Sequence, residues 1–223
     1  IGADSHTCTY GGIGAFSTGV GSTDLAAAMI SGKAWFRVPA SMKFNFSGKL
    51  NKWVTGKDII LHVIGDIGVD GALYRAMEFT GDTIRNLNVA DRLTICNMAI
   101  EAGGKSGIIA PDKTTEEFVK PRAKHEYKFY ASDNDAEYIE VREYDAAKLE
   151  PLVAFPFLPS NVKRISKIGE VPINQVVIGS CTNGRIEDMR LAASVLKGKK
   201  VSRKVRTLII PATREVYGKC LAE

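Results

Sequence analysis

The sequence predicts an α/β protein that contains parts of more than one domain. Short apolar runs of the kind that form buried strands alternate with amphipathic helical segments along the 223 residues, and this alternation is typical of layered α/β folds. With 45% hydrophobic and 25% charged residues, the composition is that of an ordinary globular protein. No apolar run approaches the roughly 18 residues of a transmembrane helix, and no signal-peptide pattern is present.

Cap residues and periodicity define the elements expected in the first half of the chain. The first is a short helix that Ser22 or Thr23 caps, that runs through Ile30 and that Gly32 terminates. The others are a strand at Lys43–Phe46, a helix at about Lys57–Ile67, a helix at about Val89–Ala102, and a strand at Ser106–Ala110. Thr55 and Asn88 are expected to cap the second and third helices, and the pair Gly103-Gly104 to end the third.

The second half opens with a more polar segment, Pro111 to Glu150. Phe155–Pro159 is interpreted as an extended linker and a domain boundary, because each proline disfavours helix in the residue before it. Beyond it we expect a buried strand at Gln175–Ile178, an amphipathic helix at about Ile186–Leu196 and a strand at Thr207–Ile210.

The turn after the strand Gln175–Ile178 carries a cysteine. The apolar run breaks at Gly179, and Cys181 follows in the connection to the helix that begins near Ile186. At the positive end of a helix dipole a thiolate is favoured over a thiol. Soft metals and iron–sulfur clusters bind thiolates, so Cys181 is a candidate metal ligand.

The other cysteines do not form a recognisable set with Cys181. Cys8, Cys96 and Cys220 are far apart in the sequence, with no CxxC pair. Without a secretory signal, this spacing favours reduced thiols in a cytoplasmic setting over a disulfide framework. Cys96 is most simply a small core residue.

The N-terminal segment Gly2–Gly12 combines an acid, a hydroxyl and an imidazole in the consecutive residues Asp4, Ser5 and His6. The glycines that follow do not complete a dinucleotide-binding loop, because Ser17 and Asp24 stand at its third glycine position. Gly14 and Gly19 have the spacing of a phosphate-binding loop, but Val20 stands where that loop requires lysine. Two functional interpretations stay open, a catalytic turn and a metal pair of His6 with Cys8, although nothing nearby completes a coordination sphere.

Asn97 and Glu101 are four residues apart, which places them on one face of the expected helix near its C-terminal end. A carboxylate at that end opposes the helix dipole, an unfavourable placement unless another group uses it. Considered alone, a solvated surface is the simpler interpretation.

The formal net charge of +5 is compatible with an anionic partner. The densest basic run, Lys197–Arg206, falls in a connection between a helix and a strand, where exposed lysines are common. No aromatic residue interrupts this run, so a stacking surface for single-stranded nucleic acid is not supported.

Three segments together resemble the aconitase superfamily: GADSHTCTYGGIGAFSTGVGSTDLA, ICNMAIEAGGKSGIIAPD and VIGSCTNGRIEDMR. Their order and spacing match over nearly the whole chain. The DSHTCTYGG and SCTNGRIEDMR turns are more similar to the large subunits of isopropylmalate dehydratases than to true aconitases, and homoaconitase large subunits are an alternative. The resemblance implies aconitase-like three-layer α/β domains, with the end of a first domain at residues 1–35, a second at 36–155 and the start of a third at 156–223.

The resemblance also implies a [4Fe–4S] cluster held by three cysteines, with one iron open to the substrate as a Lewis acid. Cys181 matches the first of these ligands. The implied reaction dehydrates a hydroxy acid to an alkene and rehydrates it with the hydroxyl on the adjacent carbon, as in the interconversion of isopropylmalates in leucine biosynthesis.

Five further residues match the family's site. His6 and Glu101 would form a pair that moves the proton when hydroxide leaves as water. Asp4 would orient a neighbouring histidine, Ser5 would contact a substrate carboxylate, and Asn97 would line the cluster pocket.

The chain also departs from the family pattern. The two other cluster ligands lie in a downstream CxxC-type motif that this sequence lacks, and we expect an internal fragment that is inactive and free of cluster by itself. A small subunit with a swivelling domain is the implied partner, and a hydroxy di- or tricarboxylate the implied substrate. A cytoplasmic location is expected, with no membrane contact. The alternatives are a homoaconitase or aconitase-type hydratase, and an RNA-binding relative without the cluster.

Overall fold

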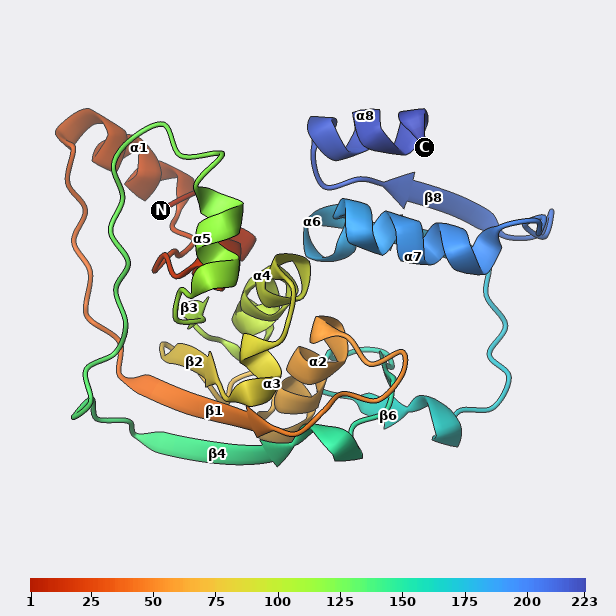
Figure 1. The fold of residues 1–223 in the computed structure, drawn as a ribbon, viewed down its shortest axis with the longest axis horizontal. Helices are drawn as coiled ribbons and strands as arrows, with labels where there is room; N and C mark the ends of the chain where they lie inside the picture. The colour runs from red at the N-terminus through yellow and green to blue at the C-terminus, as the bar shows by residue number, and fades with distance from the viewer. The chain divides into compact units, whose positions relative to one another are not determined.

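A computed structural model describes residues 1–223, and the chain forms two compact units, Ile1–Ser166 and Lys167–Glu223. The first unit contains a parallel four-stranded sheet with helices packed on it (Figure 1). The second contains a parallel pair of strands with three helices. The α/β class predicted from the sequence is therefore confirmed.

The sheet of the first unit has the strand order β3-β2-β1-β4, with every neighbouring pair parallel. Its strands are β1 (Ser41–Ser47), β2 (Ala76–Thr80), β3 (Ser106–Ile108) and β4 (Glu140–Asp145). Alternate residues of β1 are buried, as expected where one face of a strand meets the core. Phe44 pairs in register with Phe79 of β2, and their rings stack with centroids 5.3 Å apart.

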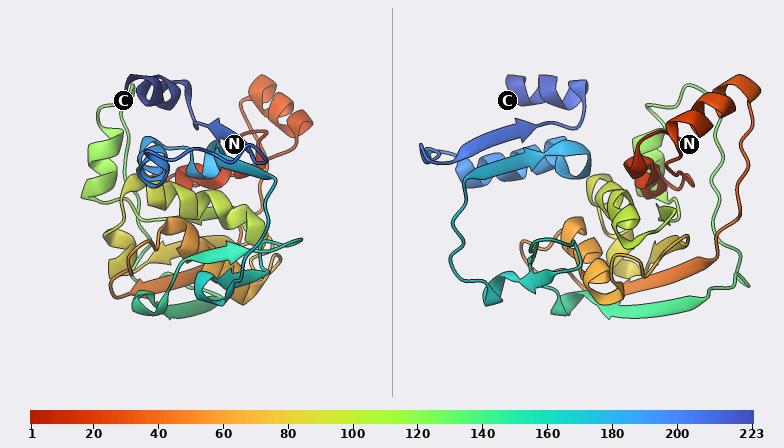
Figure 2. Two further views of the ribbon diagram at one scale, coloured as in Figure 1. Left: turned by 90° about the vertical axis from the view of Figure 1, so that its right-hand side faces the viewer. Right: turned by 180° about the vertical axis from the view of Figure 1, so that it is seen from behind.

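The helical segments of this unit precede, connect or follow its strands in the sequence. They are η1 (Ser5–Ile13), α1 (Ser22–Ser31), α2 (Gly56–Ile67), α3 (Asp82–Arg85), α4 (Val89–Asn97), η2 (Met98–Ala102), α5 (Lys113–Val119) and η3 (Ala146–Lys148), with η4 (Ile165–Lys167) at the boundary. Helices α2 and α4 lie on the same face of the sheet (Figure 2). The core is formed where Ile59, Ile60 and Ile64 of α2 are completely buried against Phe44 and Phe46.

Sequence signals for the helix ends were correct in most places. Helix α2 follows Thr55, whose N–H donates to the Asp58 carboxylate at 2.7 Å, and α4 follows Asn88, whose side chain accepts from the Asp91 N–H at 2.9 Å. Helix α1 was expected to start from a Ser22 or Thr23 cap. Its N-cap residue is instead Gly21, so no side chain caps the start of this helix.

The segment Phe155–Pro159 is the turn of a hairpin rather than a linker. Strands β5 (Leu152–Ala154) and β6 (Val162–Arg164) pair antiparallel on either side of it, and the Phe155 N–H donates to the Asn161 carbonyl at 2.8 Å. The two units divide later, between Ser166 and Lys167. The assignment of residues 1–35 to a preceding domain stays a prediction.

The second unit follows the order of elements expected from the sequence, but its first strand was expected to be buried and contains no buried residue. It contains β7 (Gln175–Gly179), α6 (Ser180–Asn183), α7 (Ile186–Leu196), β8 (Arg206–Ile210) and α8 (Arg214–Ala222). Strands β7 and β8 are parallel, with Ile178 opposite Ile209. The basic run Lys197–Arg206 lies almost entirely in the exposed connection between α7 and β8, as the solvated-loop interpretation predicts. No helix in either unit is long and apolar enough to span a membrane.

Candidate functional site

The N-terminal segment is a 3₁₀ helix, η1, rather than an open turn. The Asp4 carboxylate caps it by accepting the His6 N–H at 2.7 Å. Two hydroxyls then bond back along the helix: Thr7 donates to the Asp4 carbonyl and Thr9 to the His6 carbonyl, both at 2.6 Å. These local hydrogen bonds fix the backbone from which the His6 ring projects.

The His6 ring lies between two carboxylates. Its Nε2 is 3.2 Å from Glu101 Oε1, and its Nδ1 is 3.2 Å from Ser5 Oγ and 3.6 Å from Asp4 Oδ1. A neutral ring with its proton on Nε2 donates to Glu101 and accepts from the Ser5 hydroxyl, and a protonated ring donates toward both carboxylates. The His6 side chain is 28% exposed, so this group is accessible to solvent.

Glu101 reaches His6 because the helix ends earlier than the sequence predicts. Helix α4 stops at Asn97, a 3₁₀ turn covers Met98–Ala102, and Gly103 closes it in the left-handed conformation at φ +80°. The expectation that Asn97 and Glu101 share one face of a continuous helix was therefore wrong. The tighter 3₁₀ turn redirects Glu101 toward η1.

The Asn97 side chain is completely buried beneath the same segment. Its Nδ2 donates to Thr9 Oγ1 at 2.7 Å, and its carbonyl accepts from Cys8 Sγ at 3.2 Å. Asn97 thereby holds η1 against α4. Its predicted contact with a cluster or substrate stays a prediction.

Two glycines let η1 pack main chain against main chain. A Cβ on Gly11 would collide with the carbonyl oxygen of Gly107 in β3, and one on Gly12 would lie 2.8 Å from the backbone of Arg92 in α4. The pair Gly11-Gly12 thus serves close packing of the His6 segment, not the binding of a phosphate.

A buried ion pair missed by the sequence reasoning supports α4 at this contact. The Arg92 side chain is completely buried and binds Asp112 through two parallel hydrogen bonds of 2.8 and 2.7 Å. Burial raises the pKa of Asp112, but the hydrogen bonds and charge of Arg92 outweigh this and hold that pKa below its usual range. The only sign of this ion pair in the sequence was an arginine among apolar positions of a predicted helix.

The alternative of a zinc site at His6 and Cys8 does not match the geometry. Cys8 Sγ is buried and points to the Asn97 carbonyl, whereas the His6 ring faces Glu101. No group of three His, Cys, Asp or Glu side chains within residues 1–223 is placed to hold a metal ion. Cys96 is completely buried, and that burial raises the pKa of its thiol, in agreement with a core residue.

Cys181 lies in a tight strand-to-helix turn of the second unit. Gly179 has φ +116° and Ser180 has φ +70°. A side chain at Gly179 would collide with the carbonyl oxygen of Ile210 in β8, and the Gly184 carbonyl accepts the Ala212 N–H at 2.8 Å. The turn is therefore fixed against the end of β8, with Cys181 exposed.

Cys181 does not lie at the positive end of α7, where the sequence analysis placed it. Cys181 belongs to the separate one-turn helix α6, and α7 starts only at Ile186. The Asp188 carboxylate occupies the start of α7, where it accepts from the Arg185 N–H at 3.0 Å and from Asn183 Nδ2 at 2.9 Å. The positive end of α7 therefore already has its anion.

One ligand position of an iron–sulfur cluster fits the Cys181 turn, because the thiol is exposed and its backbone is held rigidly. The remaining cysteines do not extend this donor set: Cys8 and Cys96 are buried in the other unit, and Cys220 is half-buried on α8. The family resemblance implies three cysteine ligands for such a cluster. Residues 1–223 supply one well-placed candidate.

Comparison with known sequences defines the class of protein. The sequence profile of the aconitase family (aconitate hydratase) matches residues 1–172 and 161–223. The chain belongs to this family.

Curated relatives narrow the similarity within the family. The chain is 67% identical over all 223 residues to the 3-isopropylmalate dehydratase large subunit of Syntrophus aciditrophicus and 66% identical to that of Hydrogenobaculum sp.. It is 62% identical over 228 aligned residues to that of Aquifex aeolicus. In each case the match covers 100% of this chain and 53% of the relative, so the chain spans about half the length of the curated relatives it matches.

Proposed function

We propose that this chain is part of the large subunit of a 3-isopropylmalate dehydratase, a hydro-lyase of leucine biosynthesis that interconverts 2- and 3-isopropylmalate. Relatives that carry this name are 60–67% identical along the whole chain. The single structural observation that supports it best is the contact between His6 Nε2 and Glu101 Oε1 at 3.2 Å. This contact joins two family motifs that are 95 residues apart in the sequence.

In the proposed reaction, His6 handles the proton of the leaving group. Dehydration breaks a C–O bond, and a proton delivered to the departing hydroxyl lets it leave as water. Glu101 accepts the His6 Nε2–H and holds the ring in place. Asp4 and Ser5 lie on the opposite ring nitrogen, and Ser5 is also the residue proposed to bind a substrate carboxylate. In rehydration the same ring takes a proton back from water.

The complete enzyme is proposed to contain a [4Fe–4S] cluster with Cys181 as one ligand, and Asn97 near it. Such a cluster supplies a Lewis acid that binds the substrate hydroxyl. A small subunit is the proposed partner, because the relatives are named as large subunits, and a cytoplasmic location is proposed with it.

The test uses the complete large subunit reconstituted with its small subunit, iron and sulfide. With 2-isopropylmalate, we expect absorbance of the alkene intermediate to appear and then 3-isopropylmalate to form. The substitution Glu101→Gln keeps the size of the side chain but removes the charge beside His6, and we expect kcat to fall by roughly 10²–10⁴-fold. Glu117→Gln, an exposed carboxylate of α5, is the matched control and should retain full activity.

Three outcomes contradict the proposal. Turnover of homocitrate or citrate without turnover of 2-isopropylmalate would assign the chain to another hydratase of the family. A Glu101→Gln enzyme with unchanged kcat would remove the proposed role of the pair. RNA retention that depends on salt and on the Lys197–Arg206 run, in a protein without turnover, would favour the nucleic-acid-binding alternative.

A further inference from the structure

The Thr9 hydroxyl joins the His6 segment to the end of α4. Its Oγ1 donates to the His6 carbonyl at 2.6 Å and accepts from Asn97 Nδ2 at 2.7 Å. Thr9 is 9% exposed and Asn97 is completely buried. The direction of both hydrogen bonds is fixed, because a carbonyl only accepts and an amide nitrogen only donates. One buried oxygen atom therefore connects the main chain of His6 with a side chain of α4.

The two ends of this connection lie next to the two members of the His6–Glu101 contact. In a 3₁₀ helix, residues i and i+3 lie on the same face, so Thr9 shares the face of η1 that carries His6. Asn97 is the last residue of α4 and directly precedes η2, which carries Glu101. The Thr9–Asn97 hydrogen bond and the His6–Glu101 contact therefore join the same two segments of the chain.

Of these two contacts, the buried one determines the geometry. The side chains of His6 and Glu101 are 28% and 38% exposed, and a charge pair in such a position stabilises little because water competes for both partners. Asn97 Nδ2, by contrast, is buried, so no water replaces the Thr9 oxygen if that bond is lost, and a buried donor without an acceptor is costly. The exposed contact between His6 and Glu101 thus depends on the buried bond beneath it.

The close packing of Gly11 and Gly12 does not by itself fix the direction of the His6 ring. These glycines set how near η1 lies to β3 and α4. Rotation of η1 about its own axis would still carry the His6 ring toward or away from Glu101. A hydrogen bond is directional, so the bond from Asn97 to Thr9, one turn of η1 beyond His6, limits this rotation.

We propose that Thr9 is a positioning residue of the site, whose hydroxyl sets the place of the His6 ring against Glu101 through Asn97. The kinetic consequence rests on the proposed function, because only there does His6 act on a substrate. The geometric consequence holds for any reaction. A Thr9 that served stability alone would leave the contact between His6 Nε2 and Glu101 Oε1 unchanged when its hydroxyl is removed.

The substitution Thr9→Val tests this role, because valine keeps the shape of the side chain and removes both hydrogen bonds. In a crystal structure of the complete large subunit, we expect His6 Nε2 and Glu101 Oε1 to lie farther apart than about 3.5 Å, beyond hydrogen-bonding distance. In the enzyme reconstituted with the small subunit, iron and sulfide, we expect kcat for 2-isopropylmalate to fall by roughly 10- to 100-fold, with KM changed by less than about threefold. Thr9→Ser retains the hydroxyl and should restore kcat to within about threefold of the wild type.

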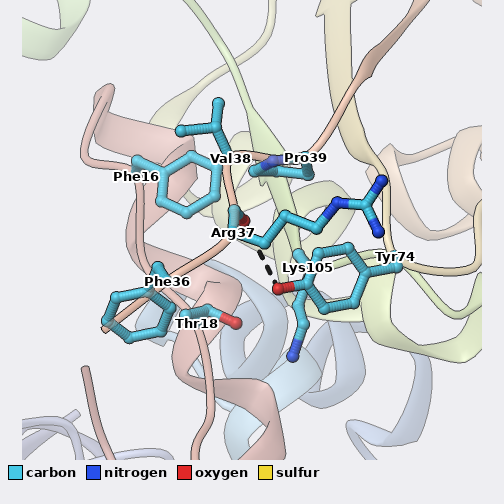
Figure 3. Close-up of a pocket in the computed structure, with 8 residues that line it drawn as sticks. All are labelled: Phe16, Thr18, Phe36, Arg37, Val38, Pro39, Tyr74 and Lys105. Carbon is cyan, nitrogen blue, oxygen red and sulfur yellow. Dashed lines mark hydrogen bonds between the residues drawn. The ribbon is translucent and has the colours of Figure 1, made fainter. Parts of the chain in front are cut away.

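Two variants outside the site are the controls. Thr83 of α3 is 3% exposed and donates to the Gly48 carbonyl at 2.6 Å, so Thr83→Val removes an equally buried hydroxyl from a helix that carries no residue of the site. Tyr74→Phe removes a hydroxyl that donates to the Arg37 carbonyl at 3.3 Å (Figure 3). The residues that line this hollow include neither His6 nor Glu101. Both variants should keep the His6–Glu101 contact and the wild-type kcat.

Several results would overturn the proposal. They are an unchanged His6–Glu101 contact in Thr9→Val, a kcat that falls no further than in Thr83→Val, a change confined to KM, and a Thr9→Ser enzyme as slow as Thr9→Val. If Thr9→Val does not fold, Thr9→Ala removes the same hydroxyl and is judged by the same two measurements. Failure of both to fold, while Thr83→Val folds, would show a purely structural role and overturn the proposal.

Failure of the proposed function gives a different result. A wild-type enzyme without turnover of 2-isopropylmalate would contradict that function, and the crystal structures of Thr9→Val and Thr83→Val would still show whether Thr9 sets the place of the His6 ring.

Discussion

Replacing Asp112 with asparagine tests whether the buried guanidinium of Arg92 supports the His6 segment. The variant keeps the shape of the side chain and one acceptor oxygen but removes the negative charge. Arg92 then retains the Leu87 carbonyl at 3.1 Å and the Arg85 carbonyl at 2.7 Å, with no anion to neutralise it. A buried charge that loses its partner is strongly destabilising.

The expected magnitude follows from the burial of the two partners. Removing one partner of a fully buried pair costs about 3–5 kcal/mol. Arg92 is 0% exposed but the Asp112 side chain is 32% exposed, so water partly replaces the lost carboxylate and we expect about 2–3 kcal/mol. The measurement is native-state hydrogen exchange in α4, where this loss corresponds to exchange faster by roughly 30- to 150-fold.

The matched control is Glu117→Gln on α5, the helix that Asp112 caps. Glu117 pairs with Lys113 at 3.9 Å, and both side chains are largely exposed, so its loss should cost at most about 0.5 kcal/mol. Equal effects of the two substitutions on α4 would refute the reasoning, because they would show that burial of Arg92 makes no difference.

The pH dependence of the Asp112 effect has a defined sign. Burial raises the pKa of this carboxyl, but the hydrogen bonds from Arg92 and Thr115 lower the pKa by more than burial raises it. The pKa of Asp112 in the folded state is therefore below its pKa in the unfolded state. Stability from such a group is fully present above the unfolded pKa of about 3.9 and is lost as pH falls through the folded pKa. The difference between the wild type and Asp112→Asn should therefore be constant above about pH 5 and narrow below pH 4.

Three further substitutions have expected outcomes of their own. Gly12→Ala should displace η1 from Arg92, because the new Cβ would lie 2.8 Å from the Arg92 backbone, and should therefore reduce turnover of the complete enzyme. Gly169→Ala is the control: a Cβ there would have no atom within 4 Å, so turnover should not change. Burial and, more weakly, the charge of Arg164 lower the pKa of His62, although the charge of Asp66 raises it. Just below pH 6.5 the folded state therefore binds fewer protons than the unfolded state, and Tm should fall between pH 7 and 5. The substitution His62→Gln should reduce that fall in Tm. Phe44→Ala removes a completely buried ring and should cost about 3–5 kcal/mol in urea unfolding of the first unit, and a loss below 1 kcal/mol would contradict its place in the core.

The elements that could be predicted have strong local signals. Helix α2 has a cap residue and apolar residues at helical spacing, and β7 is a continuous apolar run followed by glycine. The second unit's α7 and β8 were found for the same reasons. The pairing of His6 with Glu101, by contrast, came from the family resemblance, because nothing local indicates a contact over 95 residues.

The elements that were missed depend on partners distant in sequence. Strand β4 is an edge strand in which Glu140, Arg142 and Glu143 read as part of a charged loop, and it forms because β1 offers a ladder of hydrogen bonds. The Arg142 guanidinium is in turn satisfied by Asp66 of α2 at 2.6 Å. The length of α4 was overestimated because the sequence does not distinguish an α-helix from a 3₁₀ turn before Gly103.

Two side chains of the proposed site, His6 and Cys181, stand on backbone that glycine packs against a neighbouring element. His6 belongs to η1, where Gly11 meets β3 and Gly12 meets α4, and Cys181 follows Gly179, which meets the end of β8. At each contact even a methyl group would separate the two main-chain segments. A substitution there is therefore expected to displace the imidazole or the thiol without contacting it. The glycines flanking these side chains are therefore better explained by fixing where the imidazole and the thiol lie than by making a flexible loop.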